Sequence, residues 1–148
     1  MKISQRGLYA LKALTHLAES YDQGLVKIHA IAEEEALPEK FLEGILVTLK
    51  NARLVSSRRG RAGGYRLRRP PGEIVIGDVV RIIDGPLAPF GDAVELSYLV
   101  KTDPRHAGLF DLFLDVRNSA AAILDRPTLE DLVTRNRKLL ARRAKGTK

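Results

Sequence analysis

The chain has 148 residues, of which 45% are hydrophobic, so it is long enough for one full core or for a small domain with an appendage. Its formal net charge of +7 favours nucleic acid or another anionic surface as a partner. It contains no cysteine, which excludes disulfides, thiolate catalysis and all-thiolate metal sites.

Several classes of protein and site are not expected. No apolar run approaches the roughly 20 residues that span a bilayer, and the N-terminus has no signal-peptide core. We therefore expect a cytoplasmic protein without a membrane partner. His16, His29 and His106 are spread along the chain without metal-ligand spacing, so we expect no metal and no cofactor. The absence of a Gly-rich phosphate loop, of a nucleophile paired with a base and of acids converging on a histidine argues against an enzyme.

Apolar residues at every third or fourth position predict a first helix from Ser4, a suitable N-cap, to about Tyr21. Its buried face is expected to hold Leu8, Leu11, Leu14, Leu17, Ala18 and Tyr21. Asp22-Gln23-Gly24 then predicts a turn. The short apolar segment 25–27 predicts a minor strand that pairs with a basic ribbon further along the chain.

Two helices joined by a tight turn are predicted over residues 28–51, which is typical of a helix-turn-helix. The first, Ile28 to Ala36, carries Ile31 and Ala32 on its inner face. Leu37-Pro38 ends it, because proline disfavours helical geometry in the residue before it. The second helix, Glu39 to about Ala52, is expected to bury Phe41, Leu42, Ile45, Leu46 and Leu49 and to expose a largely polar front.

A basic ribbon follows at residues 54–69, with two strand-like segments around a glycine-containing loop. Between Gly44 and Gly72 there is no acidic residue. The cations of this stretch are Lys50, Arg53, Arg58, Arg59, Arg61, Arg66, Arg68 and Arg69. Clustered cations repel one another, and a polyanion beside them relieves that repulsion. A helix followed by an arginine-tipped hairpin therefore indicates a DNA-binding winged helix; the alternative is a solvated basic face.

The next segments connect this unit to the C-terminal part. A compact helix is predicted from Gly77 to Asp84, burying Val79, Val80, Ile82 and Ile83, and Gly85-Pro86 ends it. Residues 85–106 form a linker or sensor segment, in which Val94 to Val100 has the pattern of a short helix. Tyr98, Arg105 and His106 are candidates to line an effector pocket there, or else are ordinary surface residues.

A long helix is predicted over residues 107–124, with an apolar arc wider than one neighbouring element would cover. We infer a two-fold dimer through this helix, although burial within its own domain is the alternative. The candidate interface residues are Leu109, Phe110, Phe113, Val116, Ala120 and Ile123. After Arg126-Pro127, residues 128–131 are close to a capping box and begin a last helix that becomes strongly basic.

The expected fold class is therefore mainly α with a small β-hairpin: a winged helix-turn-helix domain plus a long dimerisation helix. We expect three parts, which are a DNA-binding domain at 1–84, a linker or sensor segment at 85–106, and the dimerisation and C-terminal helices at 107–148. Within the first part, the helix-turn-helix covers about 28–51 and the wing about 54–69.

The chain resembles the Rrf-two family of bacterial winged-helix transcription regulators. The matching segments are Gly7-Leu8-Tyr9-Ala10-Leu11, Ile31-Ala32-Glu33, Lys40-Phe41-Leu42-Glu43, Leu54-Val55-Ser56-Ser57-Arg58-Arg59-Gly60, Gly63-Gly64-Tyr65-Arg66-Leu67, Ile76-Gly77-Asp78-Val79, Gly85-Pro86-Leu87 and Thr128-Leu129-Glu130-Asp131-Leu132. Each motif is weak alone, but their order and spacing are specific and cover nearly the whole chain.

The resemblance implies a homodimer that binds a partly palindromic double-stranded DNA operator, usually as a repressor. It implies base contacts around Glu43 and a minor-groove contact by Arg59. Glu43 can accept a hydrogen bond from cytosine, although Glu39 and Glu43 can also simply favour a helix N-terminus. The candidate DNA-binding residues are Ser4, Arg6, Lys40, Glu43, Gly44, Thr48, Lys50, Arg58, Arg59, Gly60 and Arg61.

The chain departs from the cluster-binding members of that family, which hold three cysteines after the short fourth helix. Iron-sulfur clusters need thiolate ligands, so we expect a cluster-free regulator. A small molecule or a protein could act as its effector, but no residue identifies one. The alternative function is a winged-helix interaction module whose basic face docks an acidic protein.

Overall fold

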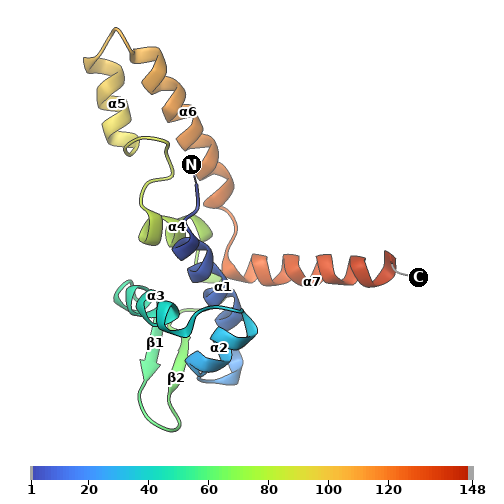
Figure 1. Ribbon diagram of the computed structural model, residues 1–148. Helices are drawn as coiled ribbons and strands as arrows, with labels where there is room; N and C mark the ends of the chain where they lie inside the picture. The colour runs from blue at the N-terminus through green and yellow to red at the C-terminus, as the bar shows by residue number, and fades with distance from the viewer. Residues whose placement is uncertain (1, 147–148) are drawn as a thin grey trace.

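The computed structural model describes residues 2–146 as helices around one small β-hairpin (Figure 1). In chain order the elements are α1 (Gln5–Glu19), η1 (Tyr21–Gln23), α2 (Ile28–Glu34), α3 (Glu39–Asn51), β1 (Val55–Arg58), β2 (Gly64–Leu67), η2 (Pro71–Glu73), α4 (Ile76–Asp84), α5 (Ala93–Thr102), α6 (Ala107–Leu124) and α7 (Leu129–Gly146). The predicted mainly α fold with a small hairpin is confirmed. Residues 1, 147 and 148 of the predicted domains lie outside the described residues.

Helix α1 packs against α3, α4 and α7 and forms the centre of the winged-helix body. Ser4 is its N-cap, as predicted, and the Ser4 side chain accepts a hydrogen bond from the Gly7 amide. The approach to α4 is so close that a Cβ on Gly7 would overlap the Asp84 carboxylate. The prediction that Leu8 is buried is wrong: it is 50% exposed, because the small residues beside it face the neighbouring helices.

The helix-turn-helix consists of α2 and α3. Helix α2 ends at Glu34, two residues earlier than predicted. Ala36, with φ of +52°, lies in the turn that follows. Helix α3 buries Leu42, Ile45, Leu46 and Leu49, as expected. Phe41 was predicted to be buried but is 43% exposed, because it lies beside the α1 surface, where its ring meets Tyr9 edge-on at 5.6 Å.

Strands β1 and β2 form the antiparallel wing, in which Val55 pairs with Leu67 and Arg58 pairs with Gly64. The predicted minor strand is present as a single bridge, in which Val26 and Tyr65 exchange two backbone hydrogen bonds of 2.8 Å each. Gly64, with φ of +151°, permits this approach, because a Cβ there would lie 2.6 Å from the Val26 carbonyl oxygen. The wing is thus joined to the chain segment that precedes α2.

Helix α4 buries Val79 and Val80, but the prediction for Ile82 is wrong. Ile82 is 39% exposed because the core lies on the other side of this short helix. The expected short helix in the linker segment is present as α5. Its N-cap is Asp92, whose carboxylate accepts hydrogen bonds from the amides of Val94 and Glu95.

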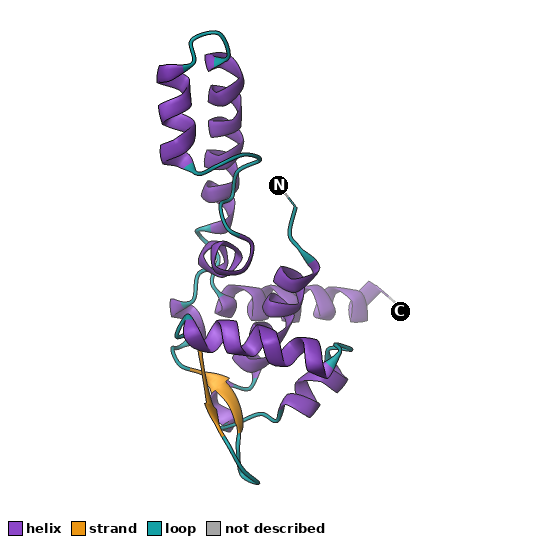
Figure 2. Ribbon diagram, turned by 60° about the vertical axis from the view of Figure 1, so that its left-hand side comes forward, coloured by secondary structure: helices purple, strands orange, loops and turns teal. Residues whose placement is uncertain are grey.

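Helices α5 and α6 form an antiparallel hairpin, and the bounds of α6 are those predicted. Figure 1 and Figure 2 both show this hairpin at one end of the molecule and the wing at the opposite end. Within residues 2–146, no helix is long and apolar enough to cross a membrane.

Helix α7 returns to the winged-helix body and crosses it beside α1. A bridge between Val75 and Thr128 joins the start of α7 to the segment before α4, and the Leu129 amide donates to the Ile74 carbonyl. The predicted capping arrangement is present, since Thr128 Oγ1 lies 3.0 Å from an Asp131 carboxylate oxygen. The hydrogen bonds from Thr128 lower the pKa of Asp131 below its ordinary value.

Candidate nucleic-acid interface

A groove of about 350 Å³ separates the exposed front of α3 from the wing. Its walls come from both parts of the predicted DNA-binding unit. The residues that line it are Lys27, Ile28, Leu46, Val47, Lys50, Ser57, Arg58, Arg59, Gly60, Gly63, Gly64 and Tyr65. Three predicted residues of the wing, Arg58, Arg59 and Gly60, therefore lie close to Lys50 of α3.

The front of α3 presents the other predicted residues to solvent. Lys40, Glu43 and Gly44 are exposed, and Thr48 is half-buried. Arg6, at the start of α1, donates a hydrogen bond to the Thr48 hydroxyl, so the structure brings these two predicted residues together. Arg6 is thereby held beside α3 although 42 positions separate it from Thr48 in the sequence.

Lys27 is a residue of this surface that the sequence did not single out. Its Nζ atom donates to the backbone carbonyls of Gly60, at 3.3 Å, and Arg61, so it ties the wing tip to the segment before α2. The sequence held one signal for this role, because Lys27 belongs to the short segment predicted to pair with the ribbon. Tip arginines Arg59 and Arg61 are themselves exposed.

The cations of the groove are electrostatically uncompensated. Within residues 2–146, no carboxylate oxygen lies within 4.0 Å of the basic groups of Lys50, Arg58 or Arg59 in the groove, or of Arg61 at the wing tip. Glu39, in contrast, lies 3.3 Å from His29, so its carboxylate is already engaged within the fold. Arginines without a carboxylate partner at a groove wall can bind phosphates, and the negative potential of a narrow minor groove attracts them.

Ser4 occupies a different position from the other predicted DNA contacts. Its hydroxyl accepts from the Gly7 amide and donates to the Asp84 carboxylate. Its backbone amide also donates to Asp84, at 2.9 Å. The Ser4 side chain therefore joins α1 to α4, and a role at DNA remains a prediction.

The predicted dimer residues of α6 divide into two sets. Leu109, Val116 and Ile123 are exposed, and Leu112, which the prediction omitted, is 57% exposed on the same stripe. Phe110, Phe113 and Ala120 are partly buried within their own chain; the Phe110 ring lies 6.4 Å from that of Phe90. Successive spacings of three, four and seven residues place the exposed set on one helical face.

A family profile described as Rrf2, iron-dependent transcriptional regulator, matches residues 3–135. This chain belongs to the Rrf2 family. Its relatives are transcriptional regulators rather than enzymes, which confirms both the predicted family and the expectation of no catalytic function.

Individual relatives align over most of the chain. The HTH-type transcriptional regulator CymR of Bacillus subtilis is 35% identical over 134 residues, covering 90% of this chain and 91% of that protein. The Mycobacterium tuberculosis protein Rv1287 is 41% identical over 132 residues, covering 89% of this chain and 81% of its own.

Solved structures of relatives share the fold of this Rrf2 protein. The structure of CymR, the global cysteine regulator of B. subtilis, matches with a TM-score of 0.73 and 32% identity, covering 90% of this chain and 97% of that one. IscR of T. potens matches with a TM-score of 0.67 and 32% identity, covering 92% and 88%. The winged helix-turn-helix fold is thus established for this chain.

The iron dependence in the family description does not fit the residues of this chain. An iron-sulfur cluster is attached mainly through thiolates, and the sequence has no cysteine. Residues 2–146 also contain no group of three or more histidines or acids arranged to hold a metal ion. In the segment that holds the cysteines in cluster-binding members, Asp92 caps α5 and Asp103 pairs with His106 at 2.9 Å.

Proposed function

We propose that this Rrf2 protein is a homodimeric, cluster-free repressor that binds a partly palindromic DNA operator. The observation that carries the proposal is the groove between α3 and the wing, with its uncompensated Lys50, Arg58 and Arg59. A recognition helix of this size fits the major groove, while a slim arginine-tipped hairpin fits the adjacent minor groove.

The front of α3 supplies the chemistry needed to distinguish bases. Glu43 can accept a hydrogen bond from the cytosine amino group, and Val47, which is 56% exposed, can contact a thymine methyl group. Arg6 and Thr48 at the same surface can bind phosphate or base edges. Arg59 at the wing tip is the proposed minor-groove contact, and the other basic groups on the wing that contact phosphates add affinity without sequence dependence.

Two copies are needed because one such unit covers only one half-site. The exposed stripe of Leu109, Leu112, Val116 and Ile123 supports a helix-to-helix contact with a second α6. Half-sites about 34–36 Å apart would let both recognition helices meet one face of the duplex. We propose repression because a dimer bound across a promoter would block polymerase.

A gel shift on DNA from the chain's own upstream region tests binding, with a scrambled duplex of the same length as the control. Retardation of the upstream DNA at low protein concentration, and its loss in the Arg59→Ala variant, is the expected result. A reporter gene behind this DNA should be more active when the protein is absent. No retardation even at low salt would reject the proposal in favour of an acidic protein partner for the basic face.

A further inference from the structure

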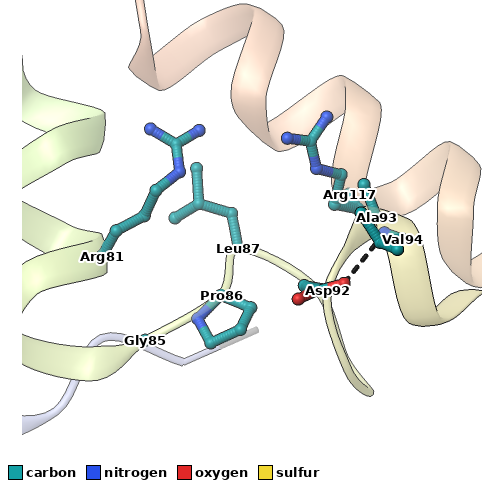
Figure 3. Close-up of a pocket in the computed structure, with 8 residues that line it drawn as sticks. All are labelled: Arg81, Gly85, Pro86, Leu87, Asp92, Ala93, Val94 and Arg117. Atoms are coloured by element: carbon teal, nitrogen blue, oxygen red, sulfur yellow. Dashed lines mark hydrogen bonds between the residues drawn. The ribbon is translucent and has the colours of Figure 1, made fainter.

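A second hollow, of about 420 Å³, lies where the linker after α4 meets the α5–α6 hairpin (Figure 3). The residues that line it are Arg81, Gly85, Pro86, Leu87, Asp92, Ala93, Val94 and Arg117. Tyr98, Arg105 and His106, the sequence's candidates for an effector pocket, are exposed and do not line it. Its volume lies within the range of about 300–1,000 Å³ typical of small-molecule sites.

Two arginines from different parts of the molecule meet at this hollow. Arg81 extends from α4 and Arg117 from α6, and Figure 3 shows their guanidinium groups facing one another across Leu87. Arg81 is already paired, because its two terminal nitrogens donate to the Asp125 carboxylate at 2.7 and 2.8 Å.

Arg117 is the cation of the hollow that lacks a carboxylate partner. Its Nη1 atom donates to the side-chain oxygen of Asn118 at 3.0 Å. Within residues 2–146, no carboxylate oxygen lies within 4.0 Å of its guanidinium. The planar guanidinium therefore keeps donors that match a carboxylate.

The surrounding charges select a singly charged ligand. Asp92 lines the hollow, and Asp125 is near enough for Arg117 to lower its pKa, after the larger effect of the Arg81 hydrogen bond. These two carboxylates repel a dianion such as a phosphate more strongly than a single carboxylate, which the Arg117 guanidinium can bind through two parallel hydrogen bonds. Pro86 and Val94 are exposed and offer apolar surface for a short aliphatic chain, whereas Leu87 lines the hollow but is only 2% exposed.

We propose that this hollow binds a short-chain aliphatic carboxylate, with its carboxylate on Arg117 and its hydrocarbon part against Pro86 and Val94. Ligand binding also alters the junction between the two halves of the molecule. A carboxylate beside Arg81 competes with Asp125, and the Arg81–Asp125 pair ties α4 of the winged-helix body to the end of α6. An effect on the operator follows only if the proposed DNA-binding function is correct.

Binding is tested without DNA, by titrating isovalerate into the isotope-labelled full chain and following backbone amide shifts by NMR. Saturable shifts should be concentrated in residues 85–94 and around Arg117. The neutral isostere isovaleramide, at the same concentration, should produce no shifts. This control uses the wild-type protein and so does not depend on the folding of a variant. Arg117→Gln should lose the shifts, whereas Arg105→Gln, which removes the same charge from an exposed site outside the hollow, should keep them.

Equal binding of the acid and the amide, or unaltered binding in Arg117→Gln, would overturn the proposal. Shifts produced by inorganic phosphate and not by isovalerate would overturn the choice of a carboxylate. A further titration measures operator affinity with and without isovalerate, where a change of about 5-fold or more is expected for coupled sites. Binding of isovalerate by a protein that retards no DNA would leave the site intact and reject the DNA-binding function alone.

Discussion

Arg59 lies at the wing tip with its guanidinium in solvent and no carboxylate partner among residues 2–146. We expect Arg59→Ala to weaken operator binding by about 1–3 kcal/mol, the range for an arginine that contacts base edges. Fluorescence anisotropy with labelled operator measures the change. Arg105→Ala, which removes an exposed charge at the far end of the molecule, should have little effect. Unchanged affinity in Arg59→Ala would remove the wing tip from the DNA contacts.

Lys27 holds the wing tip in place through hydrogen bonds to its backbone. Lys27→Met keeps most of the aliphatic stem but removes the hydrogen bonds to the carbonyls of Gly60 and Arg61. We expect weaker operator binding with little change in melting temperature, because the lost hydrogen bonds are exposed. Lys12→Met is a matched control, since Lys12 donates to the Glu35 carbonyl at a site away from the wing. A variant that binds like wild type would show that the wing needs no such support.

The Arg81–Asp125 pair predicts a pH-dependent contribution to stability. The Arg81 hydrogen bond lowers the pKa of Asp125 below its ordinary value of 3.8. Asp125 therefore stabilises the fold fully above about pH 3.8, and this contribution is lost as pH falls through the lower pKa of the folded state. Both side chains are partly exposed, at 30% and 42%, so the pair is worth only about 0.2–1 kcal/mol.

Asp125→Asn should reduce the free energy of unfolding by that small amount near neutral pH and by progressively less in acid. Urea denaturation at several pH values measures the difference. Asp111→Asn is the control, because Asp111 is exposed on the same helix and has no ion pair within residues 2–146. If the loss of unfolding free energy in Asp125→Asn grew as the pH was lowered, the stabilising role of the Asp125 carboxylate would be contradicted.

At the scale of the element, the exposed stripe of α6 is the surface proposed to hold the dimer together. Leu112→Glu places a charge in the middle of the stripe, and burying it against a second α6 without a partner is costly. We expect this variant to be monomeric in analytical ultracentrifugation and to lose operator affinity. Ala122→Glu adds the same charge to an exposed position on another face of α6 and should remain dimeric. A dimeric Leu112→Glu protein would locate the interface elsewhere.

Helix positions were predictable from the sequence, but helix faces were less so. Periodicity predicted α6 with its observed bounds, and the proline and glycine breaks predicted most helix ends. On α1, Leu14, Leu17 and Ala18 are buried as predicted, but Leu8 is not. The close contacts near Leu8 are made by Gly7, Ala10 and Ala13, whose small side chains give a weak hydrophobic signal. Large apolar residues such as Leu8 and Phe41 were instead assumed to be buried.

The candidate interface was predictable where charge and chain order coincide, as in the wing arginines. Contacts between distant segments were not: Lys27 meets the wing across 33 positions and Arg6 meets Thr48 across 42. The hollow at Arg81 and Arg117 was anticipated only in part. Six of its eight lining residues lie in the predicted linker or sensor segment 85–106, but the two arginines come from the flanking helices, and only the fold brings Arg117 to this segment.

For the whole molecule, the proposed two-fold dimer predicts a strict operator geometry. Recognition helices on a rigid dimer meet successive turns on one face of the duplex. Inserting about 5 base pairs, half of a helical turn, between the half-sites should therefore reduce binding to that of a single half-site. Gel shifts with the natural and the extended operator measure this effect. Full affinity for the extended operator would indicate that the two units bind independently.

The α5–α6 hairpin meets the winged-helix body at one end only, through the linker after α4 and the short connection to α7 (Figure 1). At 1.5 Å per residue, the 18 residues of α6 extend about 27 Å, so a tilt of about 5° at its base displaces the far end by about 2 Å. In a dimer held together by α6, the same tilt would change the distance between the two wings. A small change in the tilt of α6 at the base of the hairpin would thus prevent the two wings from fitting successive turns of the double helix at the same time.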